Sequence, residues 1–186
     1  MSLEPSQIEI LITRFIGNIF PGFYREYVFQ LPINGHEQIL EYGSGSGNCS
    51  IHLAKRLSNQ GHLTTVDISS RWQREIQKRL KKTNNVSFKL GELEDFIFPE
   101  CLFDCIFIHY VLHDIPKTIR KNKITSLTAQ LKPGGKVFIK EPLNPNHGIS
   151  EIEVRNLLTG VGLSEISMVH GKHIFAGKFF QAIYQK

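Results

Sequence analysis

Cysteine is scarce in this sequence, and long apolar runs are missing. The three cysteines, Cys49, Cys101 and Cys105, form no Cys-x-x-Cys pair. An odd, unpaired set argues against a disulfide scaffold or a zinc finger and favours a reducing compartment, so we expect a cytoplasmic protein. No apolar run reaches the roughly 18 residues of a membrane-spanning helix. Residues 1–5 lack the basic and apolar segments of a signal peptide.

A large excess of one charge is also absent. The 186 residues contain 22 Lys and Arg against 17 Asp and Glu, a net charge of +5, and 41% of them are hydrophobic. This composition excludes disorder as the main state, and the length supports one domain with its own core. A mildly basic protein permits a polyanionic partner without requiring one. The basic clusters in 71–82 and 117–123 spread around their predicted helices, so we favour solvated faces over nucleic-acid binding.

The N-terminal 36 residues carry a helical pattern and many aromatic side chains. Apolar residues recur at helical spacing from Ser6 to Phe20, with Ser6 as the N-cap and Glu9 placed to complete a capping box. A second, aromatic-rich helix is predicted over 23–31. These helices form either a lid over an apolar acceptor pocket or a cap packed on the core, and both interpretations stay open.

From residue 38 onward, short apolar strands alternate with helices. The predicted strands are 39–42, 63–67, 86–90, 105–109 and 136–140, and the predicted helices are 49–57, 71–82, 116–131 and 150–159. This alternation is typical of βαβ units and a mostly parallel sheet, which gives an α/β fold class. Residues 132–135, Lys-Pro-Gly-Gly, are predicted to form a turn. Two β-rich runs, about 164–169 and 173–184 with Gly171 between them, predict a hairpin at the sheet edge.

The segment from Glu41 to Asn48 reads Glu-Tyr-Gly-Ser-Gly-Ser-Gly-Asn. Alternate glycines after a strand let the backbone turn sharply and approach a ligand, and the following helix offers free N–H groups. The dinucleotide fingerprint Gly-x-Gly-x-x-Gly fits in neither frame, because Asn48 and Ser50 stand where its last glycine is needed. Asp67 ends the next strand, where a carboxylate binds ribose hydroxyls or, alternatively, caps a helix. We expect a nucleotide-like ligand.

Six segments of the chain resemble, in order, the motifs of the class I S-adenosylmethionine-dependent methyltransferases: 41–47, 66–69, 91–94, 103–108, 131–136 and 160–163. The resemblance covers most of residues 39–184. It implies a Rossmann-like three-layer sandwich whose mostly parallel seven-stranded sheet has one antiparallel strand in a C-terminal hairpin. It also implies S-adenosyl-L-methionine as cofactor and S-adenosyl-L-homocysteine as product. We expect a single domain over 1–186, with a helical cap or lid over 1–36 and the cofactor-binding core over 37–186.

The resemblance further implies a role for each matching residue. The implied cofactor-binding residues are Glu41, Gly43, Ser44, Gly45, Gly47, Asp67, Ile68, Glu92, Leu93 and His109. Among them Glu41 acts near the cofactor's ammonium group, Asp67 holds the ribose hydroxyls, and Ile68 packs on the adenine. Glu92 departs from the aspartate that is commoner at its position.

The end of the fourth predicted strand bears on the methyl acceptor. Residues 109–116 read His-Tyr-Val-Leu-His-Asp-Ile-Pro and lack the Asn-Pro-Pro-Tyr signature of members that methylate base amines or glutamine. The Leu-His-Asp segment is similar to that of small-molecule O-methyltransferases, in which the matching histidine is the general base. We expect His113 and Tyr110 as catalytic residues and no metal. The alternative for His113 is a polar cap on the next helix.

The sequence therefore predicts an S-adenosylmethionine-dependent methyltransferase with a small-molecule acceptor, which is apolar or aromatic if the N-terminal helices form a lid. Methylation of an oxygen would use His113 as the base. We expect a monomer or a homodimer. The alternatives are an RNA or protein methyltransferase and a non-catalytic cofactor-binding subunit of a complex, whereas Asn48 and Ser50 disfavour a nicotinamide oxidoreductase.

Overall fold

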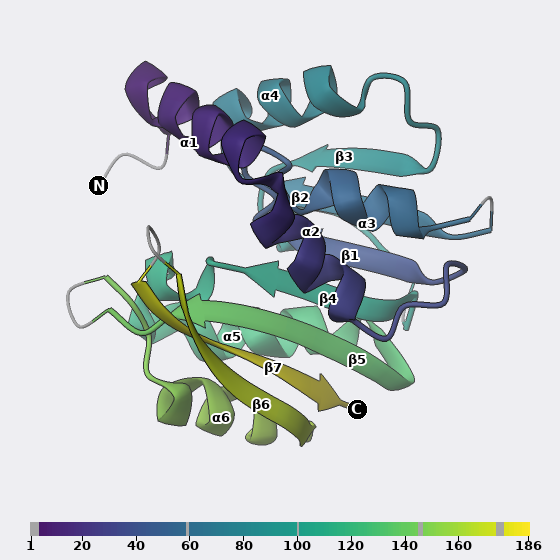
Figure 1. The fold of residues 1–186 in the computed structure, drawn as a ribbon. Helices are drawn as coiled ribbons and strands as arrows, with labels where there is room; N and C mark the ends of the chain where they lie inside the picture. Colours follow the sequence, from purple (N-terminus) through teal and green to yellow (C-terminus); the bar gives the residue numbers. More distant parts are fainter. Residues whose placement is uncertain (1–3, 59, 100, 145–146, 174–176) are drawn as a thin grey trace. The chain divides into compact units, whose positions relative to one another are not determined.

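The structure is a computed structural model that describes residues 4–58, 60–99, 101–144, 147–173 and 177–186. Its strands follow the order β3-β2-β1-β4-β5-β7-β6 in a seven-stranded sheet (Figure 1). This order, with a C-terminal antiparallel hairpin, confirms the predicted α/β, Rossmann-like fold class. The chain divides into two compact units, 1–95 and 96–186. The single domain expected over 1–186 stays a prediction.

The first unit alternates strands with helices after two N-terminal helices. Its elements are α1 (Gln7–Ile19), α2 (Pro21–Gln30), β1 (Gln38–Tyr42), α3 (Ser50–Arg56), β2 (His62–Asp67), α4 (Ser70–Leu80), β3 (Val86–Leu90) and the 3-10 helix η1 (Leu93–Asp95). Strand β2 pairs in parallel with both β1 and β3. The carboxyl ends of these three strands therefore meet at one edge of this part of the sheet.

Capping side chains set the first residues of two helices in this unit. Ser6 Oγ accepts a hydrogen bond from Glu9 N over 3.1 Å, and Glu9 Oε2 accepts one from Ser6 N over 2.6 Å. This pair is the predicted capping box of α1. At α4, Ser69 Oγ accepts from Trp72 N over 3.2 Å. Each cap satisfies backbone N–H groups that have no partner within the helix.

The second unit carries the other four strands. Its elements are β4 (Phe103–His109), the 3-10 helix η2 (Leu112–Asp114), α5 (Lys117–Ala129), β5 (Leu131–Pro142), α6 (Glu151–Thr159), β6 (Ser164–His173) and β7 (Gly177–Gln185). Strand β4 pairs in parallel with β5, and β7 runs antiparallel to both β5 and β6. Ser150 caps α6, since its Oγ accepts from Glu153 N over 3.2 Å.

Two predicted boundaries in this unit are wrong. The predicted turn at 132–135 lies inside β5, where the pairing with β4 shifts register between Leu131 and Lys136. The predicted break at Gly171 lies inside β6, paired with Phe179. A Cβ at Gly171 would lie 2.3 Å from Cζ of Phe179, so this glycine makes room for an aromatic ring. The predicted strand from 173 includes residues 174–176, which lie outside the described residues.

The core of each unit is built from strand side chains. Fully buried residues with no exposed surface include Ile39 and Leu63 in the first unit and Ile106 and Phe138 in the second. Burying each such side chain contributes about 1.5–3 kcal/mol to stability. None of the helices named above has both the length and the apolar composition to cross a membrane.

Candidate functional site

The glycine turn after β1 is tied to the end of β2. Val66 O accepts a hydrogen bond from Gly43 N over 2.8 Å, and Asp67 Oδ2 accepts one from Gly45 N over 2.7 Å. Gly43, Gly45 and Gly47 have φ angles of 73°, 52° and 78°. Residues other than glycine rarely adopt φ angles in this left-handed region. The three glycines therefore permit the turn.

The last two glycines of the turn serve different purposes. A Cβ at Gly47 would lie 2.7 Å from Cγ1 of the buried Ile76, so Gly47 lets α4 pack closely. A Cβ at Gly45 would meet nothing within 4 Å, which leaves open backbone beside Asp67. Ser44 Oγ is buried and has no hydrogen-bond partner among the residues that the structure describes. An orphaned buried hydroxyl beside an open glycine fits a polar ligand at this turn.

Asp67 is 7% exposed and uses both carboxylate oxygens within the protein. Oδ1 accepts from Ser69 N over 2.9 Å, and Oδ2 accepts from Gly45 N. Burial raises the pKa of Asp67, the N–H groups of Ser69 and Gly45 oppose that rise, and the charge of Glu4 adds to it. Each oxygen has a second lone pair, so a pair of ribose hydroxyls still fits. Ile68 follows with 39% of its surface exposed, as an adenine contact needs.

Glu41 lies deep in the first unit, with 2% of its surface exposed. Its Oε2 accepts a hydrogen bond from Ser50 Oγ over 2.5 Å. Burial raises the pKa of Glu41 to about 8; the Ser50 hydrogen bond opposes the rise, and the charge of Asp67 adds to it. The carboxyl group therefore keeps its proton at neutral pH. A cationic group nearby would favour its ionised form, in keeping with the predicted role near an ammonium group.

Glu92 and Leu93, two of the implied cofactor-binding residues, follow the end of β3. Gly91 N donates to Asp67 O over 2.9 Å, which brings this segment to the end of β2. Glu92 N donates to Asp95 Oδ2 over 2.8 Å, and Leu93 is buried. The structure thus gathers the predicted cofactor residues of the first unit at the carboxyl ends of β1, β2 and β3.

Glu4 also contacts this region, and sequence reasoning missed it. Its carboxylate accepts from Ser70 N and Ser69 Oγ, both over 2.8 Å, and from Arg71 N over 3.2 Å. The Ser69 hydrogen bond is the largest cause that lowers the pKa of Glu4 to about 2. No local signal indicates this contact, because Glu4 is more than 60 residues away from the helix that it caps.

The second unit holds a histidine–glutamate pair. Glu141, in β5, is fully buried, and its Oε2 lies 2.7 Å from His113 Nδ1. Its Oε1 accepts from Val111 N over 2.9 Å and from Leu112 N over 2.8 Å. These three donors satisfy the buried carboxylate. Since Nδ1 donates to Glu141, Nε2 of the neutral ring is an acceptor.

The surroundings of His113 shift its proton affinity. Burial lowers the pKa of the ring, but the hydrogen bond and charge of Glu141, with the charge of Asp114, outweigh it and raise the pKa above 6.5. Sequence reasoning noted only the adjoining Asp114 and missed Glu141. The two partners are 28 residues apart. Only the pairing of β4 with β5 brings them together.

Arg120 fixes the backbone that follows His113. Its Nη2 donates to His113 O over 2.9 Å and its Nε to Ile115 O over 2.7 Å. Its Nη1 forms an ion pair with Glu153 Oε1 at 2.5 Å, and the residue is 5% exposed. The alternative role of His113 as a helix cap is not supported, because the N-cap of α5 is Pro116 and no side chain caps it.

His109 and Tyr110 stand at the end of β4, in the second unit. Burial, with the charge of Lys140, lowers the pKa of His109 to about 3, so its ring is neutral near pH 7. Tyr110 has a φ of 57°, and its N–H donates to Lys140 O over 2.9 Å. A non-glycine residue in this region costs on the order of 1–3 kcal/mol. The strained turn leads the chain into η2, where the N–H groups meet Glu141.

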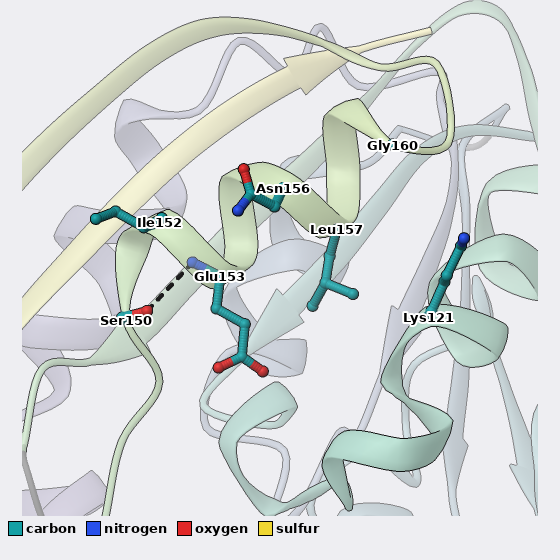
Figure 2. Close-up of a pocket in the computed structure, with 7 residues that line it drawn as sticks. All are labelled: Lys121, Ser150, Ile152, Glu153, Asn156, Leu157 and Gly160. Carbon is teal, nitrogen blue, oxygen red and sulfur yellow. Dashed lines mark hydrogen bonds between the residues drawn. The ribbon is translucent and has the colours of Figure 1, made fainter.

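A groove of about 410 Å³ opens between α5 and α6 of the second unit (Figure 2). Its lining residues are Lys121, Ser150, Ile152, Glu153, Asn156, Leu157 and Gly160. No predicted site residue is among these described lining residues. Glu153 connects the groove to the histidine segment through its ion pair with Arg120.

Comparison with known proteins identifies the family. A family model described as a methyltransferase domain matches residues 39–135, just over half of the chain. The ubiquinone/menaquinone biosynthesis C-methyltransferase UbiE of Vibrio cholerae serotype O1 is 27% identical over 112 residues, which cover 59% of this chain and 42% of that protein. The matched part thus spans less than half the length of this relative.

Solved structures share the fold at low identity. A SAM-dependent methyltransferase from Aquifex aeolicus is 18% identical, with a TM-score of 0.74 and 91% of each chain covered. The N-methyltransferase NodS from Bradyrhizobium japonicum WM9, in complex with S-adenosyl-L-homocysteine, is 21% identical, with a TM-score of 0.73 over 89% of this chain and 86% of NodS. The family model, matched across the glycine turn and the carboxylates at the strand ends, decides the assignment: the chain belongs to the class I S-adenosylmethionine-dependent methyltransferases.

Proposed function

We propose that this protein transfers a methyl group from S-adenosylmethionine to a hydroxyl-bearing small molecule, with His113 as the general base. The hydrogen bond between His113 Nδ1 and Glu141 Oε2, at 2.7 Å, carries this proposal. Because Nδ1 donates to Glu141, Nε2 of the neutral ring has a free lone pair and can accept a proton, as a general base must.

The first unit supplies groups suited to the cofactor. Ser44 Oγ and the open backbone at Gly45 suit its polar parts, and Asp67 suits the ribose hydroxyls. Ile68 offers an exposed apolar side chain to the adenine. When bound, S-adenosylmethionine supplies an electrophilic methyl group whose leaving group, a neutral thioether, needs no acid.

The second unit supplies the proton acceptor. As the acceptor oxygen forms its bond to the methyl carbon, its proton moves to Nε2 of His113. The ring then carries a positive charge, which the buried carboxylate of Glu141 stabilises from the Nδ1 side. Tyr110, whose ring meets that of His113 edge-on at 6.5 Å, would help to position the acceptor. Without the base, such a transfer loses typically 10²–10⁴-fold in rate.

A second candidate is methylation of a ring carbon beside a hydroxyl. The relatives that are 27% identical carry the name C-methyltransferase, which favours it. The same base serves both reactions, because removing the hydroxyl proton makes an aromatic ring carbon nucleophilic. The remaining alternatives are an RNA or protein acceptor and a cofactor-binding subunit of a complex.

The test is an acceptor screen with the purified chain and S-adenosylmethionine carrying a labelled methyl group. The panel contains phenols, hydroxylated quinone precursors and aliphatic alcohols, with total RNA and a protein extract as competing acceptors. Nuclear magnetic resonance of the product then identifies the methylated atom. Label on a small molecule supports the proposal, whereas label on RNA or protein alone contradicts it.

The role of the base is tested by His113→Ala. We expect this variant to lose turnover while binding S-adenosylhomocysteine as the wild type does in calorimetry. His170→Ala is the matched control, since His170 pairs with Glu151 elsewhere in the same unit. Full activity of His113→Ala would remove the role.

A further inference from the structure

Two side chains beside the proposed base have no role in the proposed function. His113 Nε2 lies 3.4 Å from Asp114 Oδ1, and His147 Nε2 lies 3.9 Å from the same oxygen. Ligand atoms of all three residues lie within 4.8 Å of one another. Two ligands of a tetrahedral ion with bonds of about 2.0–2.1 Å stand about 3.3 Å apart. The cluster therefore needs only a small closure to share one ion.

The ring of His113 is held as metal-binding histidines commonly are. Its Nδ1 is bonded to the Glu141 carboxylate, so Nε2 is the nitrogen left for a metal ion. Glu141 is itself fixed by the backbone N–H groups of Val111 and Leu112. The orientation of this first ligand is thus set before any ion arrives.

The other two ligands are accessible. The side chains of Asp114 and His147 are 62% and 64% exposed, which gives an ion a path from solvent. The rings of His113 and His147 meet edge-on, with centroids 4.6 Å apart. An exposed imidazole can rotate to bring its nitrogen into the coordination sphere. Two imidazoles and one carboxylate suit a borderline transition-metal cation, unlike Mg²⁺ and Ca²⁺, which prefer oxygen ligands.

We propose that His113, Asp114 and His147 form a binding site for a divalent transition-metal cation of the Zn²⁺ type. Binding of the ion does not depend on the proposed function, but its consequence does. A bound ion takes the same Nε2 lone pair that the base needs. Metal binding and proton transfer at His113 therefore exclude one another, and the ion inhibits methyl transfer.

The test uses Co²⁺ as a spectroscopic probe on the full chain without a histidine tag. We expect visible absorption from Co²⁺ bound with one-to-one stoichiometry, abolished when Zn²⁺ is added. His147→Gln and Asp114→Asn each remove one ligand, and Glu141→Gln loosens the ring of His113. Each variant should weaken Co²⁺ binding on the order of 10–100-fold. His170→Gln, outside the cluster, should bind Co²⁺ as the wild type does.

Two outcomes overturn the site: no visible absorption from Co²⁺ with the wild type, or absorption that is unchanged in His147→Gln. The consequence is measured as the Zn²⁺ concentration that halves turnover, which should rise on the order of 10-fold or more in His147→Gln. If Co²⁺ binds as expected while Zn²⁺ leaves turnover unaffected, the metal site stands and the base role of His113 fails. The two proposals thus fail separately.

Discussion

The carboxylate of Asp67 accepts a hydrogen bond from the backbone N–H of Gly45 over 2.7 Å, which joins the end of β2 to the glycine turn after β1. The two residues are 22 positions apart. The bond holds the carboxylate beside the open face of the turn, where a Cβ at Gly45 would meet no atom within 4 Å. The Asp67 carboxylate is thus held where it can accept hydrogen bonds from a ribose bound at the turn.

Asp67→Asn should weaken the binding of S-adenosylhomocysteine. Hydrogen bonds to a charged group contribute about 1.5–3 kcal/mol, which corresponds to roughly 10- to 100-fold in affinity. Calorimetric titration measures the loss. Asp104→Asn is the control, because Asp104 pairs with the partly exposed Lys132 in the other unit. Equal affinities of wild type and Asp67→Asn would show that this carboxylate does not hold the ribose.

Substituting the two glycines of the turn should separate binding from stability. Gly47→Ala places a methyl group 2.7 Å from Cγ1 of Ile76 and should destabilise the fold by about 1–3 kcal/mol. Gly45→Ala meets open space, so its cost is the left-handed backbone alone, about 1–2 kcal/mol. Its methyl group should nevertheless obstruct the ligand. Urea unfolding and S-adenosylhomocysteine titration of both variants test this: a larger affinity loss in Gly47→Ala contradicts the assignment.

Glu41→Gln should change how stability depends on pH. The carboxyl of Glu41 has a pKa of about 8 in the folded protein and an ordinary value of 4.5, so the folded state holds the extra proton between these values. The stability that this group contributes is therefore lost as pH rises from about 4.5 to 8. Relative to wild type, Glu41→Gln should gain stability over that range and then level off. Urea unfolding at several pH values measures the difference.

Glu37→Gln gives a control of opposite sign. Burial alone would raise the pKa of Glu37, but the hydrogen bonds from the N–H groups of Asn34 and Gly35 hold it below 4.5. Its contribution to stability is present above pH 4.5 and lost as pH falls. Glu37→Gln should therefore lose stability relative to wild type as pH rises through 4.5. If the change in free energy of unfolding relative to wild type varied with pH in the same direction in both variants, the opposite pKa shifts of Glu41 and Glu37 would be contradicted.

The pH dependence of turnover should report His113. A base is active without its proton, and the raised pKa of His113 places the half-maximal rate above pH 6.5. The charged groups that face the ring are Glu141 from β5, Asp114 from η2 and Arg120 from α5, with the neighbouring ring of His147.

Glu141→Gln removes the carboxylate that raises this pKa. The acidic limb of the rate profile should move to lower pH, and kcat should fall by at least about tenfold because the ring loses its positioning partner. A purely structural role for Glu141 would lower activity at every pH without moving the limb. That result would overturn the positioning role.

Arg120→Met should destabilise the second unit. The ion pair with Glu153 is only partly buried, since the Glu153 side chain is 29% exposed and also lies 3.9 Å from Lys117 Nζ. The main loss is that of the hydrogen bonds from the Arg120 guanidinium to backbone carbonyls, at about 1–3 kcal/mol. Arg120 is 5% exposed and also holds the carbonyls of His113 and Ile115. Arg155→Met, which breaks an exposed pair with Glu165, should change stability little. Thermal unfolding compares the two, and equal effects would contradict the buried role of Arg120.

Local patterns in the sequence were enough to predict how strands and helices alternate along the chain, and its motifs were enough to predict the family. Alternating apolar runs and the capping box at Ser6 and Glu9 are local signals, because their physical causes lie within a few residues. The glycine turn is local in the same sense, since each glycine supplies its own positive φ. The turn at 132–135 and the break at Gly171 were predicted wrongly, because strand register and ring packing depend on a partner strand.

Which side chains contact one another depends on the tertiary fold. Glu141 and His113, or Glu4 and Ser69, are separated by tens of residues, and strand pairing or chain packing sets their distance. Protonation states also depend on the tertiary fold. Burial, with the neighbouring charge of Asp67, raises the pKa of Glu41 to about 8, which the sequence does not indicate. Sequence motifs indicate local backbone conformations. The pKa values of side chains and their hydrogen-bond partners instead result from the desolvation and contacts that folding creates.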